Sequence, residues 1–182
     1  MLYLIRHGKT DWNQRHKLQG STDIPLNEEG RRMAEAARGE CLEIPFDVCF
    51  SSPLIRARET AEILFRGRDV PIFTDDRLKE MGFGDYEGQE NSFDIPDCPI
   101  NVLFFSPEKY TDPPGGAESL ESLFARTGAF LRERVDPLLR ENRNVLIVGH
   151  GAMNSSIACQ VKHLPVSQFW SVRMDNCRLI RL

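Results

Sequence analysis

Two arginines and two histidines in this chain follow apolar runs, a placement typical of an anion-binding site. Arg6 and His7 come directly after the run 2–5, and Arg56 and His150 follow two further runs. Guanidinium groups bind phosphate oxygens through paired, permanently charged donors, and a neutral imidazole can attack phosphorus. A second imidazole, if protonated, adds a donor and a positive charge. Each residue alone is more often structural, but together the four predict a phosphoryl-transfer site.

The spacing of these residues argues against other phosphate and hydrolase chemistries. The segment 3–10, YLIRHGKT, ends like a nucleotide-binding P-loop, but that motif needs glycine where Tyr3 stands. The thiol-phosphatase spacing C-x-x-x-x-x-R fails at every cysteine, and Cys49 misses Arg56 by one position. Neither H-E-x-x-H nor G-x-S-x-G occurs. A histidine nucleophile remains, and no obvious carboxylate cage for a metal accompanies it.

Composition limits the class of protein. The chain has 182 residues, 41% of them hydrophobic, and a formal net charge of −4, which argues against generic binding to nucleic acid or acidic membranes. No apolar run is long enough to span a bilayer, and we see no leader, so we expect a cytoplasmic protein. The cysteines number five, with no C-x-x-C, which predicts neither a disulfide framework nor a zinc site.

Strand-like and helix-like segments alternate along the chain. The expected strands are 2–5, 47–51, 70–74 (an edge strand containing a proline), 144–148 and 178–182. The expected helices are 28–42, 52–65 capped by Ser52, 120–139 ended or kinked by Pro137, and one beginning near Ala152. This alternation predicts a three-layer α/β/α sandwich with a mostly parallel central sheet. Ligands bind beyond the carboxyl ends of such strands, where both arginines and both histidines would converge.

Segment 87–118 differs from the rest of the chain. It is rich in Pro, Asp and Asn, and its apolar residues have no sustained period. We expect this segment to form a small inserted cap, either a mobile cap or a long loop, within a single domain that spans residues 1–182. The segment has seven acidic residues against one basic residue, Lys109, and several aromatic residues.

Five stretches resemble, in order, the motifs of the histidine phosphatase superfamily in its phosphoglycerate-mutase-like branch. They are LIRHGKTDWN, SSPLIRARETA, LKEMGFGDYEG, PPGGAESLESLFAR and VLIVGHGAMN. The resemblance implies that His7 is the phosphorylated nucleophile and that Arg6, Arg56 and His150 complete the phosphate pocket. It also implies that Glu80 is the proton donor, and one carboxyl group could serve both the leaving group and the attacking water.

The resemblance also implies a set of substrate contacts. Asn13 matches a residue that contacts the transferred phosphoryl group, and we expect further contacts from Gly8, Gln19, Gly20 and Gly151. Two departures from the family pattern, Lys9 and Ala117, leave the phosphate constellation intact. Lys9 would add attraction for an anionic substrate.

We expect a metal-independent, cofactor-independent phosphatase acting on small phosphorylated metabolites, as a monomer or homodimer. The acidic, aromatic 87–118 segment favours a neutral, apolar or aromatic leaving group over the anionic substrate of a mutase. Simple packing explains the aromatic residues equally well. A basic loop, Arg15-His16-Lys17, instead favours a second anionic group and keeps a mutase-type phosphotransferase open, although His16 itself is more simply a surface residue. A non-catalytic module that binds phosphorylated ligands is the third alternative.

Overall fold

The computed structural model describes residues 1–182 and contains a five-stranded sheet at its centre. The strands are β1 (Leu2–Arg6), β2 (Val48–Ser51), β3 (Ile72–Thr74), β4 (Val145–Gly149) and β5 (Leu179–Arg181). Their spatial order is β3-β2-β4-β1-β5. The first four strands run parallel, and β5 pairs antiparallel with β1 at one edge. The mostly parallel sheet is therefore confirmed.

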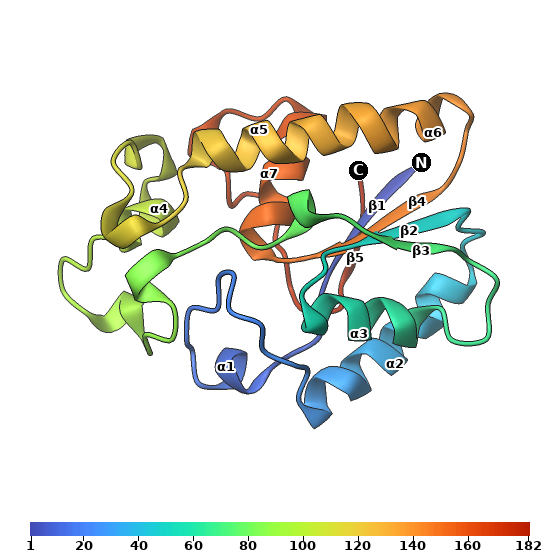
Figure 1. Cartoon of the computed structure of the whole chain (residues 1–182), viewed down its shortest axis with the longest axis horizontal. Coiled ribbons are helices and arrows are strands. Elements are labelled where there is room, and N and C mark those ends of the chain that lie inside the picture. The colour runs from blue at the N-terminus through green and yellow to red at the C-terminus, as the bar shows by residue number, and fades with distance from the viewer.

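Helices cover both faces of this sheet (Figure 1). On one face lie α2 (Glu28–Leu42) and α3 (Ile55–Leu64). On the other lie α5 (Leu120–Phe130), α6 (Asp136–Arg140) and α7 (Gly151–Lys162). Two short helices, α1 (Asp11–Gln14) and α4 (Asn101–Phe105), lie outside the layers. The architecture is the expected α/β/α sandwich.

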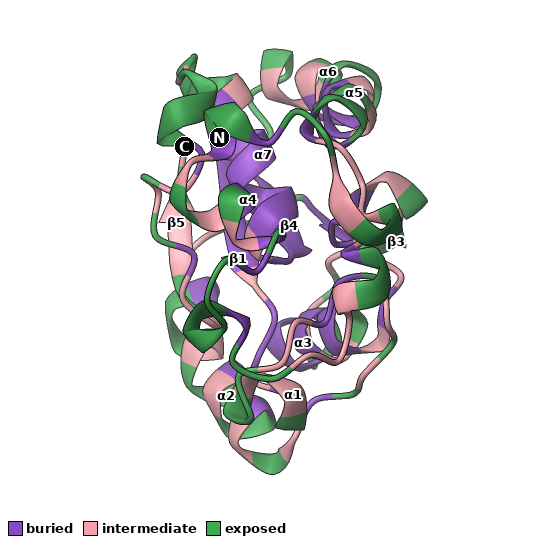
Figure 2. Cartoon of the chain, turned by 90° about the vertical axis from the view of Figure 1, so that its left-hand side faces the viewer, coloured by how far each residue is buried: buried purple, intermediate pink, exposed green.

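The three inner strands β1, β2 and β4 are buried on both faces, as their continuous apolar sequences require, whereas the edge strand β3 is exposed and β5 is only partly buried. Alternate residues point to opposite sides, so Leu4 and Ile147 belong to the core cluster under α5 and α7. Ile5 and Leu146, their sequence neighbours, belong to the cluster under α2 and α3. Figure 2 shows the buried residues concentrated around β1, β4 and α7 at the centre, and exposed ones at β3 and around the periphery. The scaffold is thus well packed where it carries the site residues.

The expected start of α3 at Ser52 is wrong. The Ser52 amide donates to the Val148 carbonyl at 3.0 Å, so the chain stays extended past the end of β2. Leu54 is also extended, with φ −63° and ψ 135°, and the helix begins at Ile55. The Ser52 hydroxyl accepts from the Leu54 amide at 3.2 Å instead of capping the helix. This delay places Arg56 in the first turn of α3.

Pro137 changes the helix before it rather than ending it. Between α5 and α6 the chain forms a π-helical turn, Leu131–Val135, and Pro137 lies in the first turn of α6. Proline has no N–H to donate to the carbonyl four residues earlier, and the first turn of a helix tolerates that loss. The helix accommodates Pro137 because the turn before it is the wider π-helical turn.

Segment 87–118 contains more regular structure than its sequence indicates. It holds α4 and several single 3₁₀ turns, and Ile100, Leu103 and Tyr110 are buried against the core of the α5 side. In Figure 1, α4 lies beyond the carboxyl end of β1. The segment therefore stands next to the strand ends that deliver the predicted site residues.

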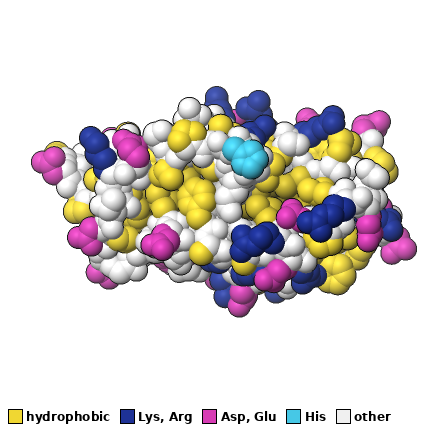
Figure 3. All heavy atoms as spheres, turned by 90° about the horizontal axis from the view of Figure 1, so that it is seen from above, with side chains coloured by type: hydrophobic (Ala, Val, Ile, Leu, Met, Phe, Trp, Pro, Cys, Tyr) yellow, Lys and Arg dark blue, Asp and Glu magenta, His cyan; other side chains and the backbone are white.

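No helix combines the length and the apolar character needed to cross a bilayer. The face seen from the α5 side carries hydrophobic side chains with Lys, Arg, Asp and Glu interspersed around them (Figure 3). That face offers no continuous basic surface.

Candidate active site

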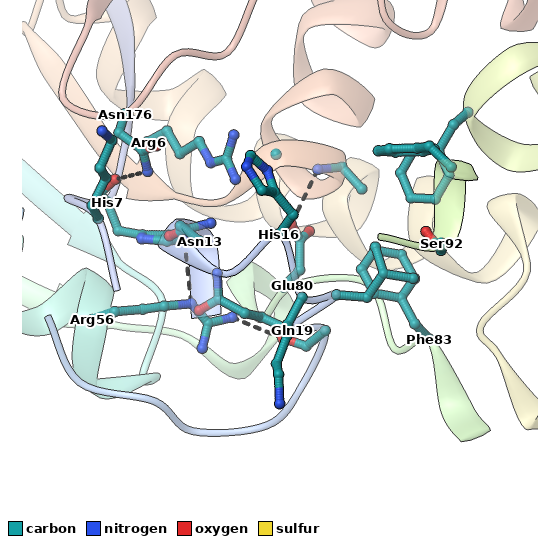
Figure 4. Close-up of a pocket in the computed structure, with 18 of the residues that line it drawn as sticks. Arg6, His7, Asn13, His16, Gln19, Arg56, Glu80, Phe83, Ser92 and Asn176 are labelled. Carbon is teal, nitrogen blue, oxygen red and sulfur yellow. Dashed lines mark hydrogen bonds between the residues drawn. The ribbon is translucent and has the colours of Figure 1, made fainter. Parts of the chain in front are cut away.

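The parallel pairing of β1 with β4 brings the two histidines together. Arg6 lies opposite Gly149 in the register, and the His7 amide donates to the Gly149 carbonyl at 3.0 Å. The ring centroids of His7 and His150 are consequently 5.1 Å apart. Arg56 enters from the first turn of α3 and reaches His7 (Figure 4). The convergence expected from the sequence is present.

Backbone contacts fix the orientation of His7. Its Nδ1 lies 2.7 Å from the Gly8 carbonyl oxygen, which can only accept, so Nδ1 carries the proton. Nε2 is then the unprotonated nitrogen, and it accepts from Arg56 Nε at 3.3 Å. Asn176 Nδ2 donates to the His7 carbonyl at 2.7 Å and holds the backbone (Figure 4). The unprotonated nitrogen of His7 is therefore Nε2, and Arg56 Nε donates to its lone pair.

Both imidazoles are held in the neutral form. Burial, followed by the nearby charges of Arg56 and Arg6, places the pKa of His7 well below its usual value. Burial and Arg56 lower the pKa of His150 in the same way. His150 is fully buried, and neither of its ring nitrogens has a hydrogen-bond partner in the protein. The sequence predicts a protonated ring beside a bound phosphoryl group; without that anion His150 is neutral, and a phosphate dianion beside it would favour the protonated ring.

Arg56 is fully buried, although arginine rarely is. Its Nη1 donates to the Thr22 carbonyl and its Nη2 to the Gly20 carbonyl, each at 2.8 Å. Burial lowers the pKa of Arg56 to about 10, while Glu80 and Asp23 oppose that shift, so the guanidinium stays charged at neutral pH. A fixed positive charge thus lies within hydrogen-bond reach of His7 Nε2.

Arg6 supplies the second guanidinium of the site. Its Nη1 donates to the Met174 carbonyl at 3.1 Å, and its Nε is buried without a protein partner. Removal from water lowers its pKa, and the negative charges of Glu80 and Asp175 counteract this. An anion between Arg6 and Arg56 would find donors on both sides.

Glu80 is held at the N-terminus of α7. Its Oε1 accepts from the amides of Met81 and Met153, each at 2.9 Å, and its Oε2 accepts from the Ala152 amide at 3.2 Å. The helix end is a favourable place for a carboxylate because its amide groups are otherwise unpaired. These contacts orient Glu80 along the wall of the same cavity as His7.

The cavity has a volume of about 400 Å³, and most of the expected residues line it. Those that do are Arg6, His7, Asn13, Gln19, Gly20, Arg56, Glu80 and Gly151. His150 and Gly8 do not: His150 is fully buried beside His7, and Gly8 packs on Gly30 of α2, where a Cβ would overlap the Gly30 carbonyl. The contribution of Gly8 here is the carbonyl that accepts from His7. Nowhere are three or more His, Cys, Asp or Glu side chains grouped so that they could hold a metal ion.

The far end of the cavity is aromatic. Phe83, Phe104 and Trp170 line it, with Phe104 stacked on Trp170 at a centroid separation of 5.5 Å. Phe93 packs edge-on against Phe104 at 5.0 Å. In Figure 4, Phe83 lies on the opposite side of the view from Arg6, His7 and Arg56. We call Phe83, Phe93, Phe104 and Trp170 the aromatic wall.

The two lysines at the cavity are paired with carboxylates. Lys9 contacts Glu29 at 2.7 Å, and Lys17 contacts Glu90 at 3.4 Å. Glu90 also pairs with Arg15. The attraction for an anionic substrate that the sequence assigns to Lys9 and to the 15–17 loop is therefore partly neutralised within the protein.

The sequence does not predict several of the cavity residues, among them Trp170, His16 and Asn176. His16 lines the cavity with a left-handed backbone, φ 52°, although its sequence favours a surface position. Its position inside a basic run next to the first motif was the available signal. Asn176 comes from the loop before β5 and pairs with Arg6 as an isolated bridge. No local pattern marks it, because its position depends on the edge strand returning beside β1.

A family model described as the histidine phosphatase superfamily (branch 1) matches residues 2–182. The solved structure of YhfR from Bacillus stearothermophilus is similar, with a TM-score of 0.86 and 32% identity over 98% of this chain and 88% of that one. A mycobacterial glucosyl-3-phosphoglycerate phosphatase, solved in complex with VO3, gives a TM-score of 0.85 at 30% identity, covering 98% of this chain and 90% of that one.

Curated relatives include both phosphatases and mutases. The chain is 35% identical to an uncharacterized phosphatase, PhoE, of Bacillus subtilis (strain 168), over 87% of this chain and 75% of that protein. It is 32% identical to a 2,3-bisphosphoglycerate-dependent phosphoglycerate mutase of Cytophaga hutchinsonii, over 90% of this chain and 76% of that protein. Similarity alone does not separate the two activities.

Proposed function

Because the chain belongs to branch 1 of the histidine phosphatase superfamily, we propose that it is a phosphatase that hydrolyses small phosphorylated metabolites through a phosphohistidine on His7. The observation that carries this proposal is the state of His7. Its Nδ1 proton is held by the Gly8 carbonyl, which leaves the Nε2 lone pair at the cavity between Arg6 and Arg56. A neutral, oriented imidazole beside two cations is what attack on a phosphoryl group requires.

The reaction proceeds in two displacements. In the first, His7 Nε2 bonds to phosphorus as the ester P–O bond breaks, and the leaving oxygen takes a proton from Glu80. In the second, water attacks the phosphohistidine, the P–N bond breaks, and Glu80 takes the proton from water. Glu80 lines the cavity with His7, which supports its place in both proton transfers, and three amide donors fix the carboxylate that acts as the base in the second.

The surrounding cations bind the equatorial phosphoryl oxygens. Arg6 has an unpartnered buried Nε, and Arg56 lies within 3.3 Å of His7 Nε2. His150, buried with both ring nitrogens unpartnered, donates to a phosphoryl oxygen once the dianion favours its protonation. Phosphoryl transfer depends chiefly on such positioning and charge neutralisation.

The far end of the cavity favours a leaving group with apolar or aromatic character. We propose that segment 87–118 acts as a cap, because it supplies Phe93 and Phe104 to the aromatic wall. The ion pairs of Lys9 and Lys17 leave little net positive charge for a second anionic group. An aromatic contact of this kind contributes about 0.5–1.5 kcal/mol.

A mutase-type phosphotransferase is the second candidate. Lys9, His16 and Lys17 line the same cavity and offer possible partners for a substrate carboxylate. Relatives with 29–32% identity include phosphoglycerate mutases. This activity would require that the phosphohistidine pass its phosphoryl group to a second substrate in preference to water.

Comparison of two substrates tests the proposal. We expect hydrolysis of an aryl phosphate with a higher kcat/KM than hydrolysis of 3-phosphoglycerate, and no mutase turnover above the hydrolytic rate. Phe104→Ala should lower kcat/KM for the aryl ester about two- to tenfold and leave the 3-phosphoglycerate value unchanged. Mutase turnover faster than hydrolysis would overturn the proposal. Binding of inorganic phosphate without turnover of any ester would instead support a non-catalytic module.

A further inference from the structure

Glu87 accepts five hydrogen bonds, although it does not line the cavity. Its Oε1 accepts from the Ser21 amide at 2.9 Å, the Ser21 hydroxyl at 3.0 Å and the Phe83 amide at 3.1 Å. Its Oε2 accepts from the Thr22 amide at 3.0 Å and from the Thr22 hydroxyl. One carboxylate thus ties residues 21 and 22 to the turn that follows Glu80.

The same short loop holds Arg56. The carbonyls of Gly20 and Thr22 accept from the two terminal nitrogens of the Arg56 guanidinium, each at 2.8 Å. Arg56 Nε then reaches His7 Nε2. The contacts form a continuous series from Glu87 through the loop 20–22 and Arg56 to His7.

Gly20 allows this arrangement to close tightly. Its φ is +54°, a conformation that favours glycine, and a Cβ at this position would overlap the Glu87 carboxylate. The loop backbone therefore lies directly on Glu87. Burial alone would raise the pKa of Glu87, but hydrogen bonds from Thr22, Ser21 and Phe83 outweigh it and keep the pKa below its usual value. The carboxylate form that accepts all these bonds is the stable one.

We propose that Glu87 is a positioning residue for phosphoryl binding, which acts by fixing the loop 20–22 whose carbonyls orient the Arg56 guanidinium toward His7. The proposal deepens the proposed function, since it assumes that Arg56 binds the phosphoryl group. Glu87 itself does not line the cavity. It therefore acts through Arg56 and makes no contact with substrate.

A double-mutant cycle on phosphate affinity tests this directly. Glu87→Gln keeps the size of the side chain but removes its charge and replaces one acceptor oxygen by a donor. In the otherwise wild-type protein, we expect the Kd for inorganic phosphate or orthovanadate to rise about 10- to 100-fold, the effect of misplacing a positioned group by about 1 Å. In an Arg56→Ala background, the same change should alter Kd less than about twofold.

Controls separate positioning from a general loss of structure. Glu108→Gln removes an exposed carboxylate of the same 87–118 segment that makes no hydrogen bond or ion pair, and it should leave Kd unchanged. Thr22→Val removes one hydroxyl donor, leaves Glu87 in place, and should raise Kd about threefold if Glu87→Gln fails to fold. Glu87→Gln should also lower kcat/KM for an aryl phosphate when Arg56 is present, and should have little further effect in the Arg56→Ala background.

Two outcomes would overturn the role of Glu87: an unchanged Kd in folded Glu87→Gln, or an equal loss of affinity with and without Arg56. Failure of the proposed function would give a different experimental result. A wild-type protein that binds phosphate but hydrolyses no ester would refute the phosphatase and still allow the cycle to be measured by binding.

Discussion

At the scale of single residues, the site depends on burying groups that are usually solvated. His7 and His150 are buried as neutral rings, and Arg56 is buried as a cation held by two carbonyls. Burial, and after it the same cations that would attract a phosphate, lower the pKa values of both histidines. The proposed nucleophile, His7, is thereby unprotonated before a substrate binds, at a cost to stability in acid.

That cost gives a pH prediction. An unfolded histidine has a pKa of about 6.5, and both buried rings have lower values, so below pH 6.5 the unfolded state binds protons that the folded state does not. The free energy of unfolding should therefore fall as pH drops below about 6.5, by up to about 1.4 kcal/mol per pH unit for each histidine. Urea unfolding between pH 5 and pH 8 measures this dependence of the unfolding free energy on pH.

His150→Gln is the matched variant. It should reduce the slope of unfolding free energy against pH below about 6.5 and leave the slope between pH 7 and pH 8 as in the wild type. An identical acid slope in both proteins would show that His150 is not buried in the neutral form.

The sequence predicts the site residues that follow strands. Arg6, His7 and His150 come after continuous apolar runs, which are typical of buried parallel strands. The sequence could not identify Asn176, nor the position of His16 in the cavity. Both depend on where a loop returns in three dimensions. Nor could the sequence show that His150 is buried with both ring nitrogens unpartnered, because that depends on the packing around the ring.

At the scale of elements, the predicted boundaries that are wrong are those that tertiary contacts determine. Ser52 reads as a helix cap, yet its amide pairs with Val148 on the neighbouring strand and keeps the chain extended. Segment 87–118 reads as a loop, yet Ile100 and Leu103 are buried in the core and support short helical turns. Regular periodicity made α2 and the central strands predictable, whereas these elements form only through packing.

Helix α2 offers a paired test of the packing that supports the first motif. Gly39 is exposed, and nothing lies within 4 Å of a Cβ added there. Gly39→Ala should raise the free energy of unfolding by about 0.5–1 kcal/mol, because alanine loses less backbone entropy in a helix. Thermal or urea unfolding measures the change.

Gly30 in the same helix should respond in the opposite direction. A Cβ there would overlap the backbone of Lys9, and Gly8 and Gly30 pack directly on each other. Gly30→Ala should destabilise the protein by about 1–3 kcal/mol, the usual cost of overpacking. Equal stabilisation by both alanines would contradict this close approach between α2 and the chain after β1.

At the scale of the whole molecule, the sheet gathers groups that are far apart in the sequence. Residues from β1, α3, the loop after β3 and the end of β4 meet at one edge, and segment 87–118 stands over them. The formal net charge is −4, so positive charge is concentrated locally in the site. The chain order of the motifs predicted this assembly, and membership of the superfamily agrees with it.

The most direct test of the account is rapid quenching of the protein during turnover of an aryl phosphate, followed by mass spectrometric mapping of the phosphoryl group. We predict an acid-labile, base-stable adduct on His7 that is absent in His7→Ala. It should accumulate in Glu80→Gln, because an aryl leaving group needs little protonation while water still needs a base. Turnover with no adduct, or with the phosphoryl group on another residue, would contradict the account.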